Sequence, residues 1–105
     1  MPKFLITYHG SEGPPPDPEA RKQIEAAFMA WAHSVGTALA DPGAPLANFK
    51  TVSSSGVADG QAGGVFGGYT ILDAPDVDAA AKLCETHPYV KRGGELQVSQ
   101  SVGLD

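Results

Sequence analysis

The chain of 105 residues has little cysteine, little positive charge and no long apolar run. Its single cysteine, Cys84, excludes an intramolecular disulfide and a cysteine-rich metal site, and it fits a reducing, cytoplasmic setting. Seven basic residues stand against twelve acidic ones, and no Lys/Arg cluster exceeds a pair, so a phosphate backbone would be repelled. We therefore expect no nucleic-acid partner. No apolar run reaches the roughly eighteen residues of a membrane span, so we expect no membrane partner either.

Metal and nucleotide motifs are also missing. The three histidines, at positions 9, 33 and 87, lack the short i, i+2 or i, i+4 spacing of metal sites, and no acidic pair stands at ligand spacing beside them. The glycine pairs at 63–64, 67–68 and 93–94 lack the spacing of a phosphate-binding loop. We expect no metal and no cofactor.

Alternation and apolar spacing predict four strands and two helices. Phe4 to His9 alternates as a strand, and the Gly/Pro-rich segment after it predicts a loop that ends in Asp17-Pro18, a helix N-cap followed by proline. The apolar residues of the first helix then recur in one stripe. They are Ala20, Ile24, Ala27, Phe28, Trp31, Val35, Ala38 and Leu39, and the turn residues 41–45 are expected to end the helix.

The second half of the chain predicts two central strands, a helix and a final strand. We expect strands at 48–53 and about 66–73, joined by a mobile connection at 53–64. A helix should begin at Asp73 or Asp76 and end at Pro88, and Leu96, Val98 and Val102 supply the apolar side of the last strand.

The resulting order, β-α-β-β-α-β, is typical of a ferredoxin-like α+β sandwich, in which both helices cover one face of an antiparallel sheet. We expect one domain over residues 1–105. The other sheet face should then carry a mixed set of side chains that a lone chain leaves open to water. The set is Leu5, Thr7, His9, Thr70, Leu72, Gln97 and Ser99. Such a face predicts a homodimer, in which a second copy covers it.

Several segments of the chain resemble the YCII-related family, including its DGPF-containing branch. The segments are 3–9, 31–43, 67–74 and 86–98, which together span nearly the whole length. The resemblance implies a dimeric α/β barrel of ferredoxin-like units with a pocket between sheet and helices. It also implies, for some members, a dehydrochlorinase or hydrolase activity built around a His and Asp pair. This chain carries His87 where better-known members have Asp, and it keeps only Asp59-Gly60 of the DGPF motif.

Three residues are candidates for catalysis. His9 ends the first strand on the open face, where an imidazole can act as general base or acid. The alternative is a strand-end histidine hydrogen-bonded to the flanking loop. Asp73 is placed to orient an imidazole or to cap the second helix. His87 is a candidate through the family resemblance, and the simpler alternative is a cation at the negative end of the second helix.

Five further residues are candidates for ligand contact, namely Thr7, Tyr69, Trp31, Gln97 and Ser99. Trp31 lies on the helix stripe and is also expected in the core, with a partner for its indole N–H. His33 should lie at the surface, and Cys84 should be an inert thiol in the core. The sequence favours a protein that binds a small organic ligand in a dimer pocket. The alternatives are a hydrolase or lyase with a histidine base and a non-catalytic structural or interaction protein.

Overall fold

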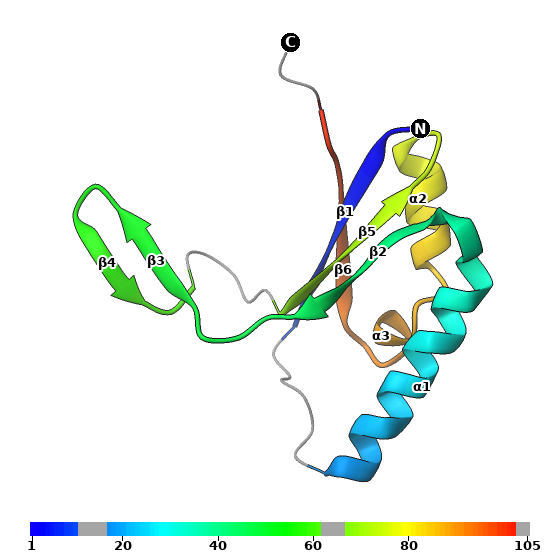
Figure 1. Ribbon diagram of the computed structural model, residues 1–105, viewed down its shortest axis with the longest axis horizontal. Coiled ribbons are helices and arrows are strands. Elements are labelled where there is room, and N and C mark those ends of the chain that lie inside the picture. Colours follow the sequence, from blue (N-terminus) through cyan, green and yellow to red (C-terminus); the bar gives the residue numbers. More distant parts are fainter. Residues whose placement is uncertain (11–16, 62–66, 103–105) are drawn as a thin grey trace.

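The computed structural model describes residues 1–10, 17–61 and 67–102 as strands, helices and their connections (Figure 1). The strands are β1 (Lys3–His9), β2 (Leu39–Pro45), β3 (Lys50–Ser53), β4 (Gly56–Asp59), β5 (Gly68–Asp73) and β6 (Glu95–Gln100). The helices are α1 (Pro18–Val35), α2 (Val77–Cys84) and α3 (Pro88–Lys91), and a 3-10 turn, η1 (Gly36–Ala38), follows α1.

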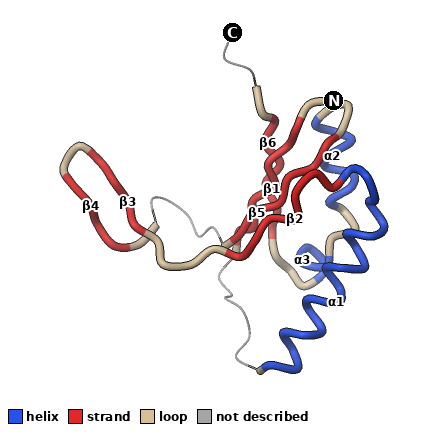
Figure 2. Tube along the Cα trace, viewed as in Figure 1, coloured by secondary structure: helices blue, strands red, loops and turns tan. Residues whose placement is uncertain are grey.

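The main sheet is antiparallel, with strand order β2-β5-β1-β6. This is the order of a ferredoxin-like fold, with β5 and β6 as its third and fourth strands. The helices α1 and α2 lie on the same side of the sheet (Figures 1 and 2). The predicted α+β class, the antiparallel sheet and the placement of both helices on one face are therefore confirmed.

The second strand of this sheet is β2, and the prediction of a sheet strand at 48–53 was wrong. Pro42, Gly43 and Pro45 were interpreted as a turn, yet they lie in an edge strand, where a missing backbone donor and a register shift are tolerated. Gly43 has φ 72°, and a Cβ there would lie 1.7 Å from the carbonyl oxygen of Tyr69. The bulged edge strand thus depends on glycine at this position.

The residues predicted as the second sheet strand form a separate hairpin instead. β3 falls within the predicted strand, and it pairs with β4, which falls within the predicted mobile connection, in a two-stranded sheet. The end of that predicted connection, together with part of the predicted loop after the first strand, lies at 62–64 and 11–16, outside the described residues. The hairpin projects to the side of the main sheet opposite the helices (Figure 1).

The helix ends follow cap chemistry that the sequence shows in part. The Asp17 carboxylate accepts the Glu19 amide at 3.1 Å, as predicted, but α1 ends at Val35 because Gly36 adopts φ 60°. The N-cap of α2 is Asp76, which accepts the Ala79 amide at 2.8 Å. Asp73 therefore lies at the end of β5 and does not cap the helix.

Register fixes the two sheet faces and corrects one part of the prediction. Phe4 pairs with Leu72 and Ile6 with Thr70, and all four are buried beneath the helices. Thr70 and Leu72 were expected on the open face, and a shift of one residue in β5 accounts for the error. Their neighbours Tyr69 and Ile71 share the open face with the β1 residues opposite them.

The core lies between the sheet and the helices. Its buried apolar residues are Phe4, Ile6, Trp31, Leu72, Ala74, Ala80 and Cys84. Leu96 and Val98 of β6 pack against it as predicted. Val102 lies beyond β6 and is exposed, so it adds nothing to that strand's apolar side.

Candidate functional site

A polar pair lies on the open face at the C-terminal end of β1. Thr7 and His9 are two residues apart in an extended strand, so their side chains project from the same face. The Thr7 hydroxyl and the His9 Nε2 share a hydrogen bond of 2.7 Å. Thr7 is buried and His9 is half-buried. The pair thus holds an imidazole in a fixed orientation beside a hydroxyl.

Neighbouring strands bring three more of the predicted ligand residues to this face. Tyr69 of β5 and Gln97 of β6 are the register partners of Thr7 on its two sides. Ser99 is the next residue on the same face of β6, and it accepts a 3.3 Å hydrogen bond from the Gln97 amide nitrogen. Four of the five predicted ligand residues therefore gather with His9 on one face.

Asp73 lies far from this group. It pairs with Lys3 at the opposite end of β1, and the Lys3 Nζ lies 2.9 Å from its carboxylate. His9 lies six positions after Lys3 along the strand, which is about 20 Å at the rise of a β-strand. The structure does not bring the carboxylate of Asp73 to His9.

A second polar cluster lies on the helix side of the sheet, around His87. The Tyr8 hydroxyl lies 2.8 Å from His87 Nε2 and 2.7 Å from the Thr70 hydroxyl. His87 Nδ1 accepts the Tyr89 backbone N–H at 3.0 Å, and Thr70 donates to the Pro42 carbonyl at 3.0 Å. The cluster links α3, β1, β5 and β2 through hydrogen bonds.

The direction of these hydrogen bonds follows from the accepting Nδ1. A neutral imidazole with Nδ1 as acceptor carries its proton on Nε2, so His87 donates to Tyr8. Tyr8 then donates to Thr70, whose own proton goes to Pro42. The Tyr89 N–H occupies the one lone pair of the neutral ring, on Nδ1, so His87 has none left to accept a proton from a substrate.

Burial keeps the His87 ring neutral. Its side chain is 2% exposed, and desolvation, assisted by the charge of Arg92, lowers its pKa from 6.5 to about 4. The expectation of a cation at the end of α2 was therefore wrong. The ring instead caps the N-terminus of α3, which begins at Pro88. The prediction that Pro88 ends the preceding helix was wrong, because α2 already ends at Cys84.

Aromatic rings enclose this histidine. The Trp31 ring centroid lies 4.4 Å from that of His87, and Tyr8 meets His87 edge-on at 5.1 Å. The Trp31 indole N–H donates to the Leu83 carbonyl at 3.0 Å, so Trp31 is a core residue with a satisfied donor, as predicted. Burial also raises the pKa of Tyr8. Trp31 thus lies in this cluster, on the other side of the sheet from His9.

Tyr89 belongs to this region and was missed by the sequence analysis. Its hydroxyl donates to the His9 carbonyl at 3.1 Å and so joins α3 to the end of β1. A Cβ on Gly94 would lie 2.3 Å from the Tyr89 ring, and one on Gly10 would lie 2.7 Å from its hydroxyl. The sequence signal for Tyr89 was weak: Gly10 and Gly94 leave room for its ring, but only the fold brings them beside it.

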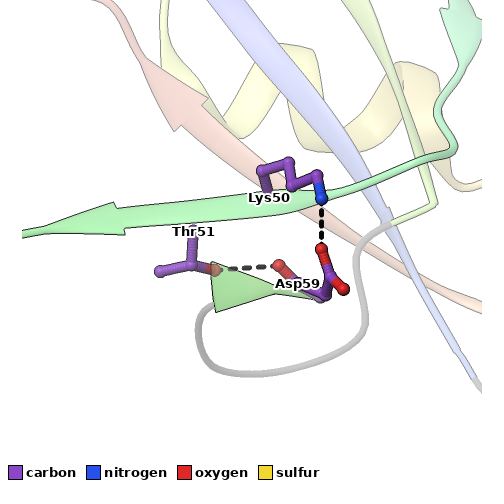
Figure 3. A network of polar contacts seen from close by, with 4 residues as sticks. Lys50, Thr51 and Asp59 are labelled. Carbon is purple, nitrogen blue, oxygen red and sulfur yellow. Dashed lines mark hydrogen bonds and ion pairs between the residues drawn. The ribbon is translucent and has the colours of Figure 1, made fainter. Parts of the chain in front are cut away.

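The other chemically interesting residues have structural surroundings. Asp59, which was compared with the start of the DGPF motif, forms an ion pair with Lys50 across the hairpin, and Thr51 donates to the Gly60 carbonyl at 2.8 Å (Figure 3). Burial raises the pKa of Cys84 to about 11, which keeps its thiol protonated, as expected for a core cysteine. His33 is exposed on α1, as predicted.

A cavity of about 400 Å³ lies between η1, α2 and the end of β5, and neither His9 nor His87 lines it. Its lining is mostly apolar, with Asp73 and Lys82 as the charged residues. Within the described ranges no three His, Cys, Asp or Glu side chains group as metal ligands. In the same part of the chain no helix is long and apolar enough to cross a membrane.

Comparison with known proteins identifies a fold relative. No protein-family model matches the chain, and no curated protein matches it by sequence. Among solved structures, it is similar to the 5-chloro-2-hydroxyhydroquinone dehydrochlorinase TftG from Burkholderia phenoliruptrix AC1100, solved in complex with 2,5-dihydroxybenzoquinone. The identity is 20%, the match covers 90% of each chain, and the TM-score is 0.51. At this identity the likeness concerns the fold.

Proposed function

We propose that this chain is a YCII-related protein that binds a small organic molecule on the open face of its sheet, beside His9. The observation that carries the proposal is the 2.7 Å hydrogen bond between Thr7 and His9 on the face opposite α1 and α2. An oriented imidazole beside an apolar and aromatic surface is the kind of polar anchor that small-molecule sites use. The buried free thiol of Cys84 fits a cytoplasmic location.

The residues around His9 favour a planar, oxygen-rich ligand. Tyr69 supplies a ring for stacking, while Thr7 and Gln97 offer hydrogen-bond donors and acceptors on its two sides. The dehydrochlorinase of similar fold was solved with a ligand of this chemical class, a dihydroxybenzoquinone. We propose a homodimer as the working unit, because a second copy would turn the open face into an enclosed pocket.

Titration with 2,5-dihydroxybenzoquinone tests the binding proposal. We expect saturable binding by the unaltered chain and a Kd raised at least about tenfold by His9→Ala, the loss of one good polar contact. His33→Ala is the matched control, since His33 is an exposed histidine on α1. Equal Kd values for the unaltered chain and His9→Ala would remove His9 from the site.

A lyase acting on a chlorinated hydroxyquinol is the second candidate, favoured by the fixed orientation of the His9 ring. In such a step the imidazole accepts a proton from the substrate, and the carbon–chlorine bond breaks with its electron pair leaving on chloride. Chloride release from 5-chloro-2-hydroxyhydroquinone measures this activity. We expect His9→Ala to abolish the release and His33→Ala to preserve it. If the chain binds the quinone but releases no chloride, the binding proposal stands and the lyase proposal is contradicted.

A further inference from the structure

The hairpin of β3 and β4 forms a sheet of its own and stands apart from the main sheet and the helices (Figure 1). It extends away from the main sheet on the side opposite the helices, so the hairpin and the open sheet face bound the same space (Figures 1 and 2). All four residues of β4 are exposed, and in β3 only Thr51 is half-buried. A two-stranded hairpin with both faces in water is marginally stable at best.

One face of the hairpin carries an apolar pair. Val52 and Val57 are cross-strand partners, 75% and 68% exposed. The open sheet face has a matching pair, because Leu5, which is 41% exposed, lies opposite Ile71. Two apolar pairs, one on the hairpin and one on the sheet, thus remain uncovered on the same side of the molecule.

The accessible area of the chain exceeds that of a compact monomer of its mass. The chain exposes 7257 Å², whereas a compact monomer of 10.8 kDa exposes about 5,500 Å². Its radius of gyration is 15.0 Å, against about 13 Å for a compact chain of this length. The hairpin contributes to this excess, because every residue of β3 and β4 except Thr51 is exposed.

We propose that the β3–β4 hairpin is an arm that clasps a second copy of this chain. In a twofold dimer the arm of each copy places Val52 and Val57 over Leu5 and Ile71 of the other copy. Both surfaces lie on one side of the chain, as an isologous interface requires. The arm of the second copy then forms the roof of the site beside His9, and this last step rests on the proposed function.

Static light scattering tests the clasp. The unaltered chain is expected at twice 10.8 kDa, and the double variant Val52→Glu/Val57→Glu at 10.8 kDa, because two carboxylates would be buried in the interface. Val77→Glu is the matched control, since Val77 is 43% exposed on the helix side, and it should remain a dimer. Circular dichroism should show the same secondary structure in all three. A monomeric unaltered chain, or a dimeric double variant, would overturn the clasp.

Quinone binding by the same variants distinguishes a failure of the proposed clasp from a failure of the proposed binding site. We expect the double variant to bind 2,5-dihydroxybenzoquinone at least about tenfold more weakly, with His9 unchanged. If the double variant is monomeric and binds the quinone as tightly as the unaltered chain, the arm of the second copy does not cover the site beside His9. A chain that dimerises through its arm but binds no quinone would contradict the proposed function and still support the clasp.

Discussion

His87 shows how one buried side chain can connect three separate parts of a small sheet protein. Its ring accepts from α3, donates to Tyr8 of β1 and through that hydroxyl reaches Thr70 of β5. Each polar group in this series of hydrogen bonds has a partner, so the cluster stabilises the fold. The arrangement requires a neutral imidazole at His87. A histidine in this state is a positioning residue and a poor proton acceptor.

The neutral state of His87 predicts how stability depends on pH. Because its pKa is about 4 in the folded chain and near 6.5 when unfolded, the unfolded chain takes up this proton first as pH falls. The free energy of unfolding should decrease between about pH 6.5 and pH 4 by on the order of 3 kcal/mol from this group, and stay constant above that range. Urea titrations across pH measure it.

The matched variant for this experiment is His87→Asn. An Asn oxygen can still accept the Tyr89 N–H, but it does not titrate, so this variant should show a weaker pH dependence than the unaltered chain. His33→Asn, on the surface of α1, should keep the full dependence. If the unfolding free energies of the unaltered chain and His87→Asn fall in parallel with pH, His87 is not the group responsible for the decrease.

The Tyr8 hydroxyl predicts a second effect at the residue scale. Tyr8→Phe removes the acceptor of the His87 Nε2–H and leaves that buried donor unpaired, which should cost about 1–3 kcal/mol of unfolding free energy. Tyr69→Phe, on the open face, is the comparison and should change stability by under about 0.5 kcal/mol. Chemical denaturation followed by circular dichroism measures both. Equal losses of unfolding free energy in the two variants would show that the buried Tyr8 hydrogen bonds stabilise the fold no more than the Tyr69 hydroxyl does.

At the scale of elements, the sequence predicted what hydrophobic periodicity controls and failed where tertiary contacts decide. The strand at 3–9, the first helix with its Asp17 cap and the helix before His87 all follow local patterns. β2 does not, because its prolines and Gly43 are typical of a turn and are held in a bulged edge strand only through pairing with β5. The one-residue shift in β5 then exchanged Thr70 and Tyr69 between the two faces.

Gly43 gives the element-scale prediction. Gly43→Ala should destabilise the fold by more than about 1 kcal/mol, since its Cβ meets the Tyr69 carbonyl and its φ is positive. Gly60→Ala has a positive φ but nothing within 4 Å of the added Cβ, so it should cost less. Thermal unfolding ranks the two variants. A Gly60→Ala midpoint at or below that of Gly43→Ala would exclude close approach as the reason for glycine in β2.

At the scale of the whole molecule, only part of the candidate site could be read from the sequence. Strand alternation placed Thr7, His9, Gln97 and Ser99 on one face, because period two needs only the strand assignment. The surroundings of His87 come from three elements distant in sequence, and no local pattern places Trp31 and Tyr8 around it. The projecting hairpin was likewise hidden within a segment of small polar residues.

The clasped dimer predicts that stability depends on protein concentration. A dimer that unfolds to separate chains gains stability by mass action, so the Tm of the unaltered chain should rise as concentration increases from about 1 to 100 μM. Trp31 is the only tryptophan and is buried beside His87, so its fluorescence reports unfolding of the core. The Tm of Val52→Glu/Val57→Glu should stay constant over the same range, while Val77→Glu should follow the unaltered chain. A concentration-independent Tm in the unaltered chain would mean that the open face and the hairpin contribute no association free energy, and the proposed interface would then have to be abandoned.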